Sequence, residues 1–517
     1  MERRRSRSHC GRIGLTLKSK KIKKVLIANR GEIANRVIRT CQEHGLKTVA
    51  VYSDSDRDSP HVHLANESYR LGPAPASESY LNIPRILDAL KRSKAQAVHP
   101  GYGFLSENPQ FAKAVTSADV VFIGPQERPM RLLGDKIAAR RLAASLGVPV
   151  VPGAGKPISS LREAAAAARA AGYPVLIKAA GGGGGKGMRI VRSQGELGEA
   201  ISGARADALL AFGDGRLFLE KYIQNPKHIE VQVIGDSRGN TIHLGERECS
   251  VQRRHQKIIE ESPSTAVDQT LRERLTEAAL KLIRRSKYTN AGTVEFIVDR
   301  ERNFYFLEVN TRLQVEHPVT EMRTGLDIVW EQIRVAEGLP LSVRQDEVEF
   351  NGHSIEARVY AEDPSNGYLP SSGTIAGFHA PAGLGVREER GFEAGTEIST
   401  FYDPMLSKAI SWGKSREQAR IRLIRVLENY EIFGVRTNIS QCLWVLDHPD
   451  FRSGSYGTSF LDKHFRADAL KAPDEILHAA IIAAALSEEY SGAWGLNGSA
   501  QSSGRGWRSK RLDAMTP

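Results

Sequence analysis

The chain has 517 residues and a mass of 56.8 kDa, which exceeds one simple core and predicts about two to four domains. With 41% hydrophobic and 26% charged residues and no run of about 18 apolar residues, the composition is that of a globular enzyme and excludes a membrane-spanning helix. The net charge of +12 does not indicate a nucleic-acid surface, because residues 1–24 hold ten basic residues against Glu2 and leave only +3 for the rest.

The basic N-terminal segment has no apolar core of a secretory signal and resembles a mitochondrial transit peptide only weakly. The plainer interpretation is a disordered tail, or a start codon placed too early. The four cysteines lie far apart and form no CxxC pair. This spacing argues against disulfides and structural zinc, and it fits a reducing, cytoplasmic location.

Short apolar runs alternate with an amphipathic helical pattern in residues 24–124, as expected for a parallel sheet covered by helices. This opening unit lacks GxGxxG, so dinucleotide binding is not indicated. The expected strands are residues 24–28, 48–52, 97–99 and 120–124, with a helix at 33–42 and a glycine-rich loop at 99–104.

A second unit begins near Asp135, and after about residue 350 the pattern becomes mixed α+β with many turns. Residues 492–505 are rich in glycine and serine, and residues 476–486 predict a surface helix. Helices of the second unit are expected at 136–146, 161–171 and 271–285, and strands at 173–179, 188–192, 215–220, 228–234, 241–245, 292–299 and 304–309.

Residues 181–187 read GGGGGKG, and five consecutive glycines are costly to order. Glycine lets backbone N–H groups close over phosphate oxygens. The run is not a Walker A loop, because Gly187 stands where serine or threonine is needed and strands are expected on both sides. With Lys178 upstream as a phosphate partner, it predicts a mobile flap over a nucleotide. A flexible hairpin tip is the alternative.

Two acidic residues lie in neighbouring strands of an expected hairpin. If the turn is 300–303, Asp299 faces Phe304, and counting back places Glu295 opposite Glu308. Opposed side chains lie about 5 Å apart, so these carboxylates repel unless a cation joins them. A solvated acidic face is the alternative.

Asn310 follows Glu308 by two residues and shares its face of the strand. Together with Glu295, these oxygen donors suit Mg²⁺ or Mn²⁺ holding ATP phosphates. If the chain stays extended, Arg312, Gln314 and Glu316 project the same way. Arg312 could then grip a small oxyanion and Glu316 could take its proton.

The basic run 252–257, QRRHQK, lies between strands that lead toward this hairpin. Such a run is usually a solvated face, but an anion-binding role is plausible here. Five segments together resemble biotin carboxylase, an ATP-grasp enzyme, over about residues 23–465. They are HPGYGFLSEN at 99–108, MRLLGDK at 130–136, GGGGGKGMR at 181–189, VQRRHQK at 251–257 and EVNTRLQVEHPVTE at 308–321.

The resemblance implies a role for particular residues, and none of these positions departs from the family pattern. The implied ATP contacts are Lys136, Lys178, Gly184, Gly185, Glu220, Lys221, Tyr222, Ile223, His228 and His255, with Glu295 and Glu308. The implied metal ligands are Glu295, Glu308 and Asn310, for two Mg²⁺ or Mn²⁺ ions. The implied bicarbonate and biotin site is Lys257, Arg312, Gln314, the Val315 backbone and Arg358, with Glu316 as the base.

The resemblance also implies an α/β fold in which an ATP-grasp fold follows an N-terminal parallel-sheet domain and precedes an α+β C-terminal biotin carboxylase domain. The expected parts are a basic extension (1–22), the N-terminal domain (23–134), the ATP-grasp domain (135–335, lid about 152–223), the C-terminal domain (336–465) and a tail (466–517).

The implied activity is ATP- and bicarbonate-dependent carboxylation of biotin through carboxyphosphate, as the first half-reaction of an acetyl-CoA or other acyl-CoA carboxylase. None of the six methionines lies in the Met-Lys-Met setting of a biotin-bearing lysine, so biotin is expected on a separate carrier protein. The expected partners are that carrier, carboxyltransferase subunits and a second copy of the chain, with neither nucleic acid nor membrane.

Two other functions remain open. Another ATP-grasp ligase, of the carboxylate–amine or carbamoyl-phosphate type, would share the flap, Lys178 and the metal hairpin. It would not be expected to share Arg312, Glu316, Arg358 and the HPGYGF loop at 99–104 together. A non-catalytic nucleotide-binding regulator would be expected to lack one of the acidic or lysine residues that are present here.

Overall fold

The structure is a computed structural model that describes residues 21–179 and 188–470. The chain divides into two units after Arg466, and the helices and sheets described here belong to the first. Of the second unit, a short 3-10 turn at Ala467–Leu470 is described. The flap glycines and the helix expected at 476–486 lie outside the described residues. Ile22 closes the predicted extension, yet it is buried and its N–H donates to Glu337 Oε1 at 2.7 Å, so the folded part includes it.

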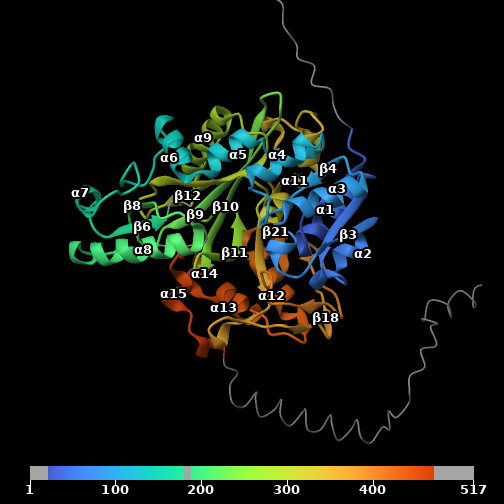
Figure 1. The fold of residues 1–517 in the computed structure, drawn as a ribbon. Helices are drawn as coiled ribbons and strands as arrows, with labels where there is room; N and C mark the ends of the chain where they lie inside the picture. The colour runs from blue at the N-terminus through green and yellow to red at the C-terminus, as the bar shows by residue number, and fades with distance from the viewer. Residues whose placement is uncertain (1–20, 180–187, 471–517) are drawn as a thin grey trace, which may run out of the picture. The chain divides into compact units, whose positions relative to one another are not determined.

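A five-stranded parallel sheet opens the chain, in the order β3-β2-β1-β4-β5 (Figure 1). Val25 and Ile27 pack into one core while Leu26 and Ala28 pack into another, because successive strand residues point to opposite faces. The predicted helix-covered parallel sheet is confirmed. Its strands are β1 Lys24–Ile27, β2 Lys47–Ser53, β3 Glu67–Gly72, β4 Ala97–His99 and β5 Val121–Phe122, and its helices are α1 Gly31–Glu43, α2 Pro60–Leu64, α3 Ile83–Ser93, α4 Pro109–Ser117 and α5 Glu127–Gly134.

A small antiparallel sheet, β7-β6-β8, has its own core of alanine and aliphatic side chains. The residues between β6 and β7 are the glycine run, so strands flank it as predicted. The sequence pattern did not predict α8. The elements are α7 Leu161–Ala171, β6 Val175–Ala179, β7 Arg189–Val191, α8 Leu197–Phe212 and β8 Leu217–Lys221.

An eight-stranded antiparallel sheet occupies the middle of this unit, in the order β13-β12-β9-β10-β11-β14-β21-β19 (Figure 1). It joins strands from both sides of residue 336, so the expected central and C-terminal parts share one sheet. Its strands are β9 Lys227–Gly235, β10 Thr241–Arg253, β11 Gln256–Ser262, β12 Asn290–Val298, β13 Phe304–Asn310, β14 His353–Tyr360, β19 Val386–Arg390 and β21 Met405–Gly413.

Helices cover this sheet and fix its position against the first one. Leu275, Leu282 and Ile283 of α9 (Gln269–Ser286) pack with β9, β12 and β13 in one core, together with residues of α6 (Lys136–Ser145). Helix α11 (Ile328–Ala336) shares a core with α1. The remaining helices are α10 His317–Thr324, α12 Arg416–Glu428, α13 Ile439–Asp447, α14 Pro449–Ser453 and α15 Phe460–His464.

Short strand pairs complete the C-terminal part: β15 Glu362–Asp363 with β16 Leu369–Pro370, β17 Gly373–Thr374 with β20 Glu397–Ile398, and β18 Gly377–His379 with β22 Glu431–Phe433. Within the described residues, no helix is long and apolar enough to cross a membrane. Cys41, Cys249 and Cys442 are buried free thiols, whereas Cys10 lies outside the described residues.

Candidate active site

The two acidic residues of the β12–β13 hairpin face each other as predicted, but not by the predicted count. Val298, rather than Asp299, pairs with Phe304, and the ladder stays in that register as far as Phe296 and Phe306. A register shift then follows, and Glu295 pairs with Glu308. The turn lies one residue away from its predicted position, and one extra residue in β13 compensates for that difference, as in a β-bulge.

The Glu295 carboxylate is buried within a set of hydrogen-bond donors. Burial alone would raise its pKa, but the charges of Lys257 and His228 outweigh burial and hold the pKa far below its usual range. Glu295 is therefore an anion at neutral pH. Its neighbours are His228 Nε2 at 2.9 Å, Lys257 Nζ at 3.2 Å, Asn310 Nδ2 at 2.8 Å and Gln314 Nε2 at 3.1 Å.

Glu308 lies nearer the surface, with 28% of its side chain exposed, and its Oε2 is 2.7 Å from Lys136 Nζ. Lys136 is the first residue of α6, and although burial opposes its charge, Glu308 raises its pKa overall. Each carboxylate of the pair is thus neutralised by a lysine, Glu308 by Lys136 and Glu295 by Lys257. Two carboxylates and an amide oxygen fit the hard-donor preference of Mg²⁺ or Mn²⁺.

The extended run expected from Glu308 to Glu316 is wrong, because β13 ends at Asn310. The Thr311 N–H donates to Glu107 Oε1 at 2.8 Å, which takes the backbone out of the ladder. The side chains nevertheless converge. Arg312 donates to Asn310 Oδ1 at 3.0 Å and to Gln314 Oε1 at 2.7 Å.

Glu316 is fully buried and precedes α10. Its carboxylate receives Lys257 Nζ on Oε1 at 2.5 Å and Arg358 Nη2 on Oε2 at 2.9 Å. Burial opposes ionisation, but these two cations lower the pKa of Glu316 well below its ordinary value. Lys257 also lies 3.2 Å from Glu295, so one ammonium links the acidic pair to Glu316.

Arg358, on β14, also donates from Nε to Glu260 Oε1 at 2.5 Å. Burial raises the pKa of Glu260 to about 7, with Arg358 acting against that rise. Glu230 is a further buried carboxylate, held by Arg247 Nε at 2.5 Å and Lys257 Nζ at 2.7 Å.

Sequence reasoning missed Glu230, Arg247 and Glu260. A usable signal was present: His228, Glu230 and Gln232 alternate with apolar residues along β9, so their side chains share one face.

Two of the predicted ATP contacts, Lys178 and Glu220, pair with each other. Lys178 Nζ is 2.5 Å from Glu220 Oε2, and Arg140, which was not predicted, is 3.1 Å from Glu220 Oε1. Lys221 donates instead to the carbonyls of Gly172 and Tyr173. Tyr222 and Ile223 follow β8 directly, and Gly184 and Gly185 lie outside the described residues.

The basic run 252–257 is not one solvated face. Arg254 and His255 form the β10–β11 turn with positive φ angles of 47° and 68°. Burial lowers the pKa of His255, as do the nearby charges of Lys178 and His228, while Asp462 acts in the opposite direction. Gln252 is buried, and its Nε2 lies 3.4 Å from His228 Nδ1.

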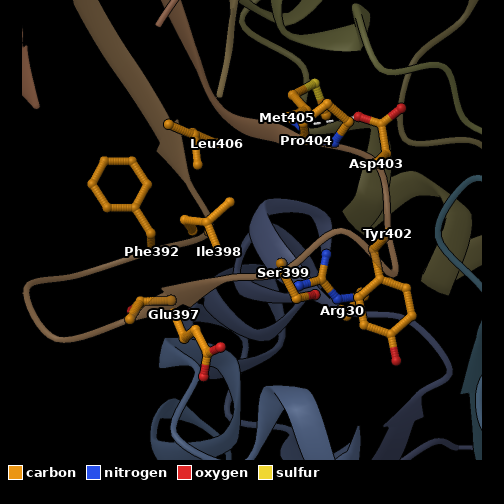
Figure 2. A pocket seen from close by; sticks show the side chains of 13 residues that line it. Arg30, Phe392, Glu397, Ile398, Ser399, Tyr402, Asp403, Pro404, Met405 and Leu406 are labelled. Atoms are coloured by element: carbon orange, nitrogen blue, oxygen red, sulfur yellow. Dashed lines mark hydrogen bonds between the residues drawn. The ribbon is translucent and has the colours of Figure 1, made fainter. Parts of the chain in front are cut away.

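A cavity elsewhere contains none of the predicted site residues. Figure 2 shows that Arg30, Phe392, Ser399, Tyr402 and Met405 surround it. Arg30 is already engaged, because its guanidinium makes two hydrogen bonds to Asp56 at 2.7 and 2.6 Å and lies 4.4 Å from the Tyr402 ring centre.

A second group apart from the site comprises His448, Asp450 and His464, whose possible metal-ligating atoms lie within 4.8 Å of one another. His448 Nδ1, however, accepts the Asp450 N–H at 3.2 Å to cap α14. A neutral His448 therefore carries its proton on Nε2, which leaves that nitrogen without a lone pair for a metal. The arrangement is that of a capped helix end.

Three family models match consecutive parts of the chain: "Biotin carboxylase, N-terminal domain" at residues 21–130, "Carbamoyl-phosphate synthase L chain, ATP binding domain" at 135–344 and "Biotin carboxylase C-terminal domain" at 356–463. Biotin carboxylase 1 of Bacillus subtilis is 48% identical over 444 residues, which cover 86% of this chain and 99% of that protein.

The human mitochondrial propionyl-CoA carboxylase alpha chain is 50% identical over 453 residues, or 87% of this chain. The match spans only 62% of that relative, which is less than two thirds of its length. The biotin carboxylase domain of Hydrogenobacter thermophilus 2-oxoglutarate carboxylase, solved as a dimer with MgADP, ADP and bicarbonate, superposes with a TM-score of 0.84 at 46% identity. This match covers 88% of this chain and 100% of that one.

Proposed function

The chain belongs to the biotin carboxylase family, and from that premise we propose that it carboxylates carrier-bound biotin with ATP and bicarbonate. The observation that carries the proposal is the junction at Lys257, whose ammonium lies 2.5 Å from Glu316 and 3.2 Å from Glu295. A proton acceptor and an acidic nucleotide-site residue are thus held by one cation. Such an arrangement suits activation of a small anion beside a phosphate chain.

In this proposal Glu316 is the base that takes the proton from bicarbonate. Its carboxylate is buried and ionised, so it is ready to accept a proton at neutral pH. Arg312 and Lys257 would hold the anion, because a guanidinium and an ammonium offset the charge that develops on deprotonation. Gln314 donates to Glu295 and accepts from Arg312, which fixes the orientation of both.

Glu295, Glu308 and Asn310 would hold the divalent cations expected for the family. When bound, these ions would offset the charge on the nucleotide phosphates. Lys136 and Lys178 add two ammonium groups on the same side, each now paired with a glutamate at 2.7 and 2.5 Å. Both lysines would turn toward the nucleotide phosphates, because these carry more negative charge than the glutamate carboxylates.

Arg358 would serve the second step, in which CO₂ released from carboxyphosphate meets biotin. Its Nε donates to Glu260 and its Nη2 donates to Glu316, so the position of the guanidinium is fixed before the substrate arrives. A fixed positive charge there would stabilise the negative charge that develops on the ureido oxygen.

The partners follow from the same proposal. We propose that a biotin carrier protein presents biotin and that carboxyltransferase subunits use the product. The similarity to acyl-CoA carboxylase alpha chains supports an acyl-CoA as the final acceptor. A second copy of the chain is a further proposed partner. The predicted domain boundaries and the individual site assignments remain predictions.

The test is an assay of the purified chain with Mg²⁺, ATP, ¹⁴C-bicarbonate and free biotin as the acceptor. We expect ATP cleavage that requires bicarbonate and rises with biotin, and label transferred to biotin. Glu316→Gln should reduce both by about 100-fold or more, because it removes the base while keeping the shape. ATP cleavage that does not require bicarbonate, or that requires an amine, would favour another ATP-grasp ligase.

A further inference from the structure

Lys408 and Arg358 face each other across β21 and β14. Side chains opposed in an antiparallel ladder lie on the same face, so this rung presents two cations together. Arg358 binds the Glu316 carboxylate at 2.9 Å, and Lys408 Nζ donates to the carbonyl of Val315 at 2.8 Å. The rung therefore holds the residue proposed as the base at two points, its side chain and the peptide bond before it.

The contact between Lys408 and the Val315 carbonyl determines how the Glu316 backbone is oriented. The Val315 carbonyl belongs to the planar peptide bond that joins Val315 to Glu316. A hydrogen bond that holds its oxygen therefore also orients the backbone nitrogen and Cα of Glu316. The Glu316 side chain makes no capping hydrogen bond to α10, although Glu316 is the N-cap residue. The backbone leaves the β13 ladder at Thr311, so regular strand pairing does not hold Val315.

Lys408 is fully buried, and a buried ammonium destabilises the fold unless it is hydrogen-bonded or paired with an opposite charge. Its ion-pair partner is Glu32 on α1, whose Oε2 lies at 3.3 Å, which is longer than the hydrogen bond to the Val315 carbonyl. Burial raises the pKa of Glu32 to about 7, so Glu32 is only a partial counterion near neutrality. The Tyr102 ring centre is 5.9 Å from the ammonium. The short directional contact of Lys408 is thus the one to Val315.

We propose that Lys408 is a positioning residue for Glu316: its ammonium fixes the Val315–Glu316 peptide so that the Glu316 carboxylate meets Lys257 and the incoming bicarbonate. This inference rests on the proposed function and adds to it a residue that touches no substrate. Lys408 also brings together segments far apart in the sequence, because β21, the loop before α10 and the start of α1 all meet at its ammonium.

The alternative is that Lys408 only balances the charge of Glu32. Three variants separate the two roles: Lys408→Met, which keeps the bulk and removes the donor, Glu32→Gln, and the double variant. Each is measured for kcat and KM with bicarbonate and with ATP, for nucleotide-binding stoichiometry and for Tm. A purely structural defect lowers the active fraction and Tm but leaves KM for bicarbonate unchanged.

We expect Lys408→Met to lower kcat/KM for bicarbonate by about 10- to 100-fold, as small misplacements of catalytic groups do, while ATP affinity stays within about 2-fold. Glu32→Gln should remain close to the wild type, and the double variant should stay as low as Lys408→Met. Recovery in the double variant, or an unchanged kcat/KM in Lys408→Met, would overturn the inference while leaving the proposed function intact. A wild-type chain without bicarbonate-dependent ATP cleavage would overturn both.

Discussion

Glu295 and Glu308 face each other across β12 and β13 because an irregularity in the ladder restores a register that the turn had displaced by one residue. Without that bulge, the pairs nearer the turn would place Leu307 opposite Glu295 and send Glu308 to the other face. The acidic pair thus depends on a local departure from regular pairing, and β-bulges often redirect a side chain in this way near functional sites.

Glu308→Gln should abolish metal-dependent ATP cleavage while leaving the fold intact. The amide keeps the shape of the carboxylate but removes a charged oxygen ligand, and the loss of phosphate charge stabilisation corresponds to about 100-fold or more in rate. The side chain is 28% exposed, and among the described residues its charged partner is Lys136, so little stability depends on it. ATP hydrolysis, circular dichroism and Tm are the measurements.

The matched control is Glu301→Gln, an exposed glutamate in the turn of the same hairpin. It should change neither turnover nor Tm. Near-normal turnover in Glu308→Gln, or an equal loss in both variants, would contradict the metal-ligand assignment.

Local sequence patterns predicted those elements well whose start and end depend on residues within or next to the element itself. Helix α7 spans Leu161–Ala171 as expected, because a serine caps its start and Gly172 takes a positive φ of 73° at its end. Strand β10 was expected to end at Gly245 but continues to Arg253, since register shifts in its ladders carry it past the glycine. Single-sequence patterns do not reveal such irregularities.

The candidate site shows the same limit. The hairpin residues are near neighbours in sequence, so counting from the turn paired Glu295 with Glu308, although the turn was misplaced by one residue. Alternation along the chain suggested Arg312, Gln314 and Glu316, whereas the resemblance to a family supplied most of the other assignments. Glu230, Glu260 and Lys408 act through partners on distant strands, so no local pattern identifies those partners. Buried charges in apolar strands are the one local hint, because they need partners supplied by the tertiary fold.

Glu261→Gln should destabilise the chain in a pH-dependent way. Burial would raise the pKa of Glu261, but hydrogen bonds from His353 and Arg416 outweigh it and hold the pKa at about 2. Because the folded pKa lies below the unfolded one, this stabilisation is complete above about pH 4.5 and is lost as the pH falls toward 2. The shift corresponds to about 3 kcal/mol at neutral pH.

Urea unfolding at pH 7 and at pH 3 tests this expectation, with a smaller gap between variant and wild type at the lower pH. Glu277→Gln is the control, because Glu277 pairs with Lys281 on the exposed side of α9 and should give no measurable change. A gap that is the same at both pH values would show that Glu261 contributes through packing alone.

Gly391→Ala tests the contact between the N-terminal and C-terminal parts. A Cβ there would lie 2.6 Å from the backbone nitrogen of Glu32 and 3.0 Å from Gly31, and backbone atoms cannot move aside cheaply. Overpacking of this kind costs about 1–3 kcal/mol. Gly377→Ala is the matched control, since its Cβ would make an ordinary 3.8 Å contact with Phe433. Thermal unfolding should give a lower Tm for Gly391→Ala than for Gly377→Ala, and equal Tm values would refute this tight contact.

Arg358→Ala should spare bicarbonate-dependent ATP cleavage more than biotin carboxylation, but the structure adds a condition. Arg358 neutralises both Glu260 and Glu316, so the single variant leaves two buried carboxylates without it. Combining Arg358→Ala with Glu260→Gln removes one of those charges. We expect the double variant to recover part of the ATP cleavage and none of the biotin carboxylation.

The two activities are compared in one assay by phosphate release and by label on biotin. Glu260→Gln alone is the control and should keep both, because Arg358 still binds Glu316 at 2.9 Å. Equal losses of ATP cleavage and biotin carboxylation in the double variant would place Arg358 in the bicarbonate step. Its guanidinium would then act through Glu316 rather than on biotin, because the Glu316 carboxylate is the one group of the proposed bicarbonate site that it contacts among the described residues.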